Sequence, residues 1–77
     1  MVNKLILHIV KSIVVEQDKV RVEDQTNGST YIVNIWVAQD DMKRIIGKEG
    51  RVIKAIRALI NALSSAEQVD VVLDSQA

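Results

Sequence analysis

The chain has 77 residues, no cysteine and one histidine, so it is one small domain without a disulfide framework or a thiolate metal site. Its formal net charge is zero, which argues against a protein that binds polyanions through bulk charge. The apolar N-terminal run is too short and too polar to span a bilayer or act as a leader, so we expect a cytoplasmic protein with no membrane partner.

The first half of the chain predicts one helix and two strands. Apolar residues recur at helical spacing over residues 4–15, and residues 19–24 alternate as a half-buried strand does. Asn27-Gly28 is a strong hairpin signal, and the β-branched and aromatic run at residues 30–38 is typical of the partner strand. A helix followed by a hairpin is therefore expected.

The second half predicts two helices and a last strand. Asp40 and Asp41 are expected to cap a short helix over residues 42–46, which Gly47 ends. A longer amphipathic helix runs from about Gly50 to Ser64 or Ser65, and residues 68–74 form a strand. The order α-β-β-α-α-β predicts an α+β fold in which helices cover one face of a three-stranded sheet.

Positive charge gathers around the turn between these two helices. Six basic residues and one acidic residue lie between Lys43 and Arg57, whereas the rest of the chain carries a net charge of −5. Gly47 is explained by a helix end alone, but Gly50 is less so, because helix starts favour Ser, Thr, Asp or Asn. The alternative is a turn that another molecule's backbone approaches, with phosphates at the following helix N-terminus. The glycine spacing does not fit a Walker P-loop.

The segments "IIGKEG" and "RVIKAIR", within this element order, resemble the KH domains of bacterial type. More closely, "VAQDDMKRIIGKEGRVIKAIRALINA" resembles the KhpA family of single-KH-domain bacterial RNA-binding proteins. The resemblance implies a type II KH fold over residues 1–77 and a GxxG loop that clamps about four nucleotides of single-stranded RNA.

Carried onto this chain, the resemblance places the loop at Gly47 to Gly50. Ile45, Ile46 and Ile53 would supply an apolar floor, although some of them must also belong to the core. The second strand near Val33 to Val37 would meet base edges together with the hairpin side. The predicted RNA-binding residues are Lys43, Ile46, Gly47, Lys48, Glu49, Gly50, Arg51, Ile53, Lys54 and Arg57.

Two residues depart from the expected pattern. Glu49 sets a negative charge in the loop, which subtracts from the attraction of Lys48 for phosphate. Trp36 is the second departure. If Tyr31, Val33, Ile35 and Val37 face the helices, the alternate residues face away from them, and Trp36 lies on the outer side of its strand. The outward-facing residues are then Ile32, Asn34, Trp36 and Ala38. An Ile32–Trp36 pair there is either a base-stacking platform or a protein contact. We favour a dimer or partner surface, because KH domains usually lack aromatic stacking.

The sequence therefore predicts a non-catalytic module that binds single-stranded RNA and needs no cofactor or metal. The resemblance implies association with itself as a homodimer and with a second KH-containing RNA-binding protein. It also implies RNA-chaperone-like, post-transcriptional regulation in bacteria, linked to cell shape. The rival hypothesis is a protein-interaction or dimerisation module with weak or no RNA binding.

Overall fold

The computed structural model describes residues 2–76 and contains the predicted order of helices and strands. The helices are α1 (Val2–Ile13), α2 (Met42–Ile46) and α3 (Arg51–Leu63), and the strands are β1 (Arg21–Asn27), β2 (Thr30–Ala38) and β3 (Gln68–Gln76). Single 3₁₀ turns at Gln17–Lys19, Gln39–Asp41 and Lys48–Gly50 join them. The predicted α-β-β-α-α-β fold is confirmed. Within the described residues, no helix is both long and apolar enough to cross a membrane.

The three strands form one mixed sheet in the order β1-β2-β3. β1 and β2 are antiparallel and joined by a tight hairpin, whereas β2 and β3 run parallel after the crossover through α2 and α3. Asn27 pairs with Thr30, so the two turn residues are Gly28 and Ser29, one position later than expected. Gly28 has a φ of 64°, which suits glycine at the first turn position.

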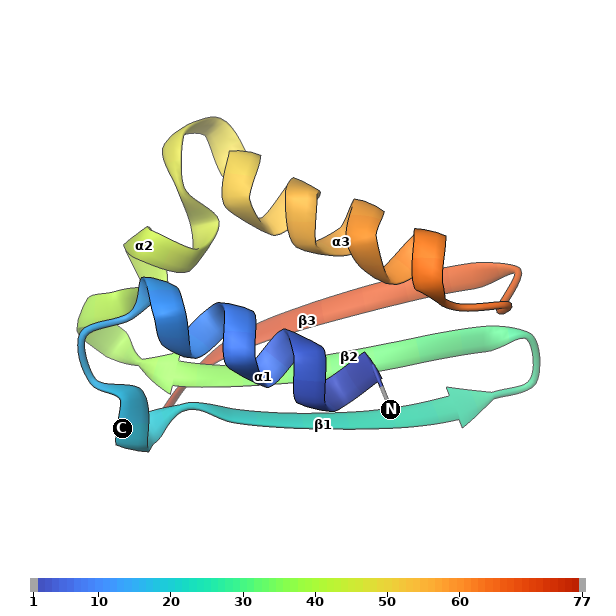
Figure 1. Ribbon diagram of the computed structural model, residues 1–77, viewed down its shortest axis with the longest axis horizontal. Helices are drawn as coiled ribbons and strands as arrows, with labels where there is room; N and C mark the ends of the chain where they lie inside the picture. Colours follow the sequence, from blue (N-terminus) through green and yellow to red (C-terminus); the bar gives the residue numbers. More distant parts are fainter. Residues whose placement is uncertain (1, 77) are drawn as a thin grey trace.

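All the helices pack on one face of the sheet, with α1 over β1 and α3 over β3 (Figure 1). The aliphatic core between these layers draws on α1, β2, α2, α3 and β3. It consists of Ile6, Val10, Val14, Val33, Ile35, Val37, Ile45, Ile56, Ile60 and Val69. Val33, Ile35 and Val37 of the central strand β2 are therefore inaccessible to any ligand.

The alternation along β2 follows the prediction with one exception. Val33, Ile35 and Val37 are fully buried beneath the helices. Tyr31 on the same face is half-buried, as are Ile32, Asn34 and Trp36 on the other. Ala38 was expected to face away from the core, but it is 2% exposed at the end of the strand.

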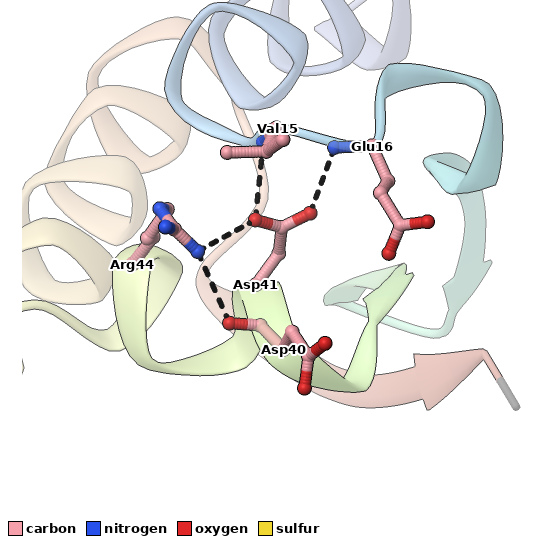
Figure 2. Close-up of polar contacts among 5 residues, drawn as sticks. All are labelled: Val15, Glu16, Asp40, Asp41 and Arg44. Atoms are coloured by element: carbon pink, nitrogen blue, oxygen red, sulfur yellow. Dashed lines mark hydrogen bonds and ion pairs between the residues drawn. The ribbon is translucent and has the colours of Figure 1, made fainter.

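The expectation that Asp41 caps α2 is wrong, because its side chain makes no capping hydrogen bond to that helix. It is fully buried and accepts hydrogen bonds from the backbone N–H groups of Val15 and Glu16, at 3.0 Å each, just after α1 (Figure 2). Nη1 of Arg44 donates to the same carboxylate at 3.1 Å and to the carbonyl oxygen of Asp40 at 3.2 Å. Asp41 therefore joins the end of α1 to the start of α2.

These contacts lower the pKa of Asp41. The hydrogen bonds from Glu16 and Val15 are the largest causes, and they outweigh the opposing effect of burial, with a further contribution from the Arg44 charge. A carboxyl whose pKa is depressed in the folded state stabilises the fold above its unfolded pKa of about 3.9. That contribution declines as pH falls below this value and is lost below the folded pKa.

We predict that Asp41→Asn lowers the free energy of unfolding at pH 7, because the amide carries no charge and can accept on one atom only. The difference from the wild type should shrink as pH falls through 4 towards 2. Urea denaturation of the variant and the wild type across this pH range measures the difference in the free energy of unfolding. Asp40→Asn is the matched control, because the Asp40 side chain is exposed and makes no hydrogen bond or ion pair within residues 2–76. Equal losses in the two variants would contradict the assignment.

Candidate nucleic-acid interface

Gly47 is required by the fold itself. Its N–H donates to the carbonyl oxygen of Lys43 at 2.8 Å and closes α2. Its φ of 71° and ψ of −179° fall in a region that only glycine adopts readily. A Cβ at this position would lie 2.6 Å from Cγ2 of Val52, which is too close for any side chain. The interpretation of Gly47 as a helix end therefore accounts for the residue without a ligand.

The backbone conformation also explains why residue 50 is glycine, which the sequence did not reveal. Glu49 and Gly50 are consecutive left-handed residues, with φ values of 57° and 72°, and they turn the chain into α3. For Glu49, which carries a Cβ, this conformation costs about 1–2 kcal/mol. A Cβ at Gly50 would meet only Cγ2 of Ile53 and Cε of Lys54, at 3.8 and 3.9 Å. These two side chains therefore flank Gly50 and leave room for ordinary contact above it.

The start of α3 is a helix N-terminus without a side-chain cap. The first N–H groups of any helix lack partners within the helix, and the helix dipole makes this end positive. Gly50 at the N-cap offers no side chain to satisfy them. The N–H of Arg51 already donates to the carbonyl oxygen of Lys48, so the N–H groups that follow it in the first turn of α3 are those that can donate hydrogen bonds to an anion.

The basic residues of α3 do not share one flank. Arg51 lines a 310 Å³ apolar groove between α1 and α3, together with Ile9, Ile13, Val52, Ala55, Ile56 and Leu59. At 100° per residue, Lys54 lies only about 60° round the helix from Arg51, whereas Arg57 lies about 120° from it, next to Ile53 and on the side away from the groove. Because α3 packs on β3, an edge strand, that side overlooks the open edge of the sheet. Arg57 thus lies on the flank away from α1, Arg51 lies on the flank towards it, and Lys54 lies between them.

The cationic side chains of the predicted site are free of partners within residues 2–76. Lys43, Lys48, Arg51, Lys54 and Arg57 are all exposed, and none of them forms an ion pair or a side-chain hydrogen bond in that part of the chain. Arg44, in contrast, is held by Asp41. Glu49 is exposed and does not pair with Lys48. The loop and the start of α3 therefore present uncompensated positive charge.

Two expectations about the base-binding groove need correction. Ile45 is fully buried and belongs to the core, so only Ile46, 41% exposed, and half-buried Ile53 can form an apolar floor. Val33, Ile35 and Val37 cannot meet base edges, because they are fully buried in the central strand. The strand beside α3 is β3, whose parallel position at the sheet edge no local sequence pattern reveals.

The element order, the parallel β2–β3 pair and the GxxG turn between α2 and α3 define a type II KH domain. The chain belongs to the KhpA/KhpB KH-domain family, because the family model described as "KhpA/KhpB, KH domain" matches residues 3–74. It is similar to the RNA-binding protein KhpA of Chlamydia trachomatis, with 38% identity over 94% of this chain and 92% of that protein. The RNA-binding protein KhpA of Clostridium acetobutylicum is 39% identical over 94% of this chain and 96% of that protein.

A solved structure supports the fold assignment. The crystal structure of a single-substitution variant of Aquifex aeolicus Era bound to GDP.AlF4- contains a region similar to this chain, with a TM-score of 0.61 and 13% sequence identity. The match covers 96% of this chain but 30% of that one. At this identity the likeness concerns the fold alone.

We predict that the three glycines differ in their tolerance of alanine. Gly47→Ala should lower the free energy of unfolding by about 3 kcal/mol, because it combines backbone strain with the overlap on Val52. Gly50→Ala should cost about 1–2 kcal/mol, from the left-handed backbone alone. Gly28→Ala is the matched control, since Gly28 has a φ of 64° and open space around it. Urea denaturation measures all three, and a Gly47→Ala loss no larger than that of the control would contradict the overlap.

Proposed function

We propose that this chain binds single-stranded RNA, without catalysis, through the GxxG loop and the adjoining flank of α3. The observation that carries the proposal is the set of unpaired cationic side chains around the glycine turn at the uncapped start of α3. The curated relatives, which are named RNA-binding proteins, support it.

Each part of the site has a distinct role in this proposal. The N–H groups at the start of α3 and the side chains of Lys48, Lys54 and Arg57 would hold phosphates, and Lys43 would extend the positive surface along α2. Ile46 and Ile53 would contact bases through their aliphatic side chains. Contacts of this kind carry little sequence information, because phosphates are common to all sequences and aliphatic surfaces make no hydrogen bonds with base edges. The binding would therefore tolerate many sequences.

One domain of zero net charge should bind weakly, with a dissociation constant of about 1 µM or higher, the usual range for non-specific nucleic-acid binding. Function would then depend on a second RNA-binding unit, supplied by another copy of the chain or by a second KH-containing protein. An RNA-chaperone-like role in post-transcriptional regulation in the bacterial cytoplasm, linked to cell shape, is the biological setting that we propose.

We predict that replacing both Lys48 and Glu49 by Asp weakens binding of a short single-stranded RNA by about tenfold or more, because a phosphate attraction becomes a repulsion. Fluorescence anisotropy at fixed salt measures it. Lys4→Asp is the matched control, since it makes the same change in net charge at an exposed position on α1.

Unchanged affinity in the double variant, with measurable binding by the wild type, would exclude the loop as the RNA site. If the wild type does not bind RNA but is dimeric by light scattering, the rival hypothesis of a dimerisation module is correct.

We also predict that the salt dependence of RNA binding separates the two flanks of α3. Each phosphate contact with a single strand contributes about −0.7 to the slope of log K against log salt concentration. Lys54→Gln and Arg57→Gln should each make the slope less steep by about 0.7. Arg51→Gln should change it less, because Arg51 lies on the flank towards α1. An equal or larger change for Arg51→Gln would contradict this division.

A further inference from the structure

The outer face of the sheet is a separate surface. Within residues 2–76 every helix lies on the other face, so none covers it (Figure 1). Strand register places three rows of side chains at its centre, each running from β1 through β2 to β3. The rows are Arg21–Trp36–Asp74, Glu23–Asn34–Val72 and Gln25–Ile32–Asp70.

Three apolar side chains form the middle of this outer face. Val72 is 46% exposed, and Ile32 and Trp36 are half-buried. Val72 lies opposite Asn34, so it is the diagonal neighbour of both Ile32 and Trp36 and within reach of each. Apolar side chains of this size on an uncovered sheet face indicate a contact surface rather than scattered exposure.

The charges around this apolar centre are mostly negative. Arg21 places its guanidinium carbon 4.9 Å from the centre of the Trp36 ring and also pairs with Glu23. Asp70 and Asp74 flank Ile32 and Trp36 on β3 and are exposed. Neither aspartate pairs with a cation within the described residues. With three carboxylates and one guanidinium, the outer face has a net charge of −2.

We propose that this outer face docks a basic segment of a partner protein. An apolar side chain of the partner sits on Ile32, Trp36 and Val72, and flanking Lys or Arg side chains face Asp70 and Asp74. Charge complementarity selects this occupant, because unpaired carboxylates beside an apolar centre attract cations.

The same charges disfavour the other two occupants. Nucleic acid would bring phosphates against three carboxylates, and Arg21 already covers one face of the Trp36 ring. A second copy joined face to face about a two-fold axis would set −2 against −2, which is repulsive. The docking surface lies across the sheet from the GxxG loop, so its occupation does not depend on RNA binding.

A peptide titration followed by two-dimensional ¹⁵N NMR tests the proposal. The probe is a ten-residue peptide that alternates Lys with Leu, and the reference peptides replace every Lys by Glu or every Leu by Ser. We expect the Lys-Leu peptide to shift the backbone amides of Ile32, Trp36 and Val72, and both reference peptides to bind at least tenfold more weakly.

Two charge-matched variants complete the experiment. Asp70→Lys with Asp74→Lys should weaken binding of the Lys-Leu peptide by about tenfold or more. Asp18→Lys with Glu67→Lys makes the same change in net charge at exposed positions off the outer face and should change binding less than about twofold. All four positions are exposed, and the amide spectrum itself reports whether each variant is folded.

Four results would overturn the proposal. The first is that the peptide fails to shift the outer-face amides, and the second is that both double variants weaken binding equally. The third is that a single-stranded RNA, and not the peptide, shifts those amides. The fourth is that light scattering shows self-association which Asp70→Lys with Asp74→Lys abolishes, since the occupant would then be a second copy.

Discussion

The buried Asp41 carboxylate fixes where the chain leaves α1 relative to where it enters α2. Its two backbone donors, on Val15 and Glu16, lie 26 and 25 residues away along the sequence, so the contact closes a loop that contains the whole hairpin. A fully buried carboxylate is tolerated only when its oxygens are bonded, and Arg44 provides the remaining partner. Because Arg44 lies in α2 one turn before Gly47, the same contact helps to fix the rotation of α2 and the direction in which the GxxG turn leaves it.

The neutral net charge conceals two surfaces of opposite sign. Positive side chains cluster on the loop and α3, and negative ones flank the outer face of the sheet. The fully buried Val33, Ile35 and Val37 of β2 lie between the two surfaces. Neither set of charges compensates the other locally, because exposed charges further apart than a Debye length of about 8–10 Å are largely screened. Bulk charge is therefore a poor guide to what this chain can bind.

The sequence predicted the element order, the three-stranded sheet and the glycine turn, because each leaves a local pattern of apolar period or turn residues. It failed for features that depend on contacts between segments far apart in the sequence. Asp41 looks like a helix cap until α1 is folded against it. The parallel β2–β3 pairing makes β2 the central strand and brings β3 beside α3, and no local pattern encodes that register. The sequence also did not predict that Glu49 and Gly50 are consecutive left-handed residues, since glutamate does not favour that conformation.

The separation of the two surfaces has a consequence for a weak binder. If the loop holds RNA and the outer face holds a basic protein segment, the two ligands contact opposite sides of the sheet and do not compete for side chains. A partner that itself binds RNA would then act on the same strand at a raised effective concentration, and the joint affinity would exceed either single one without a new contact.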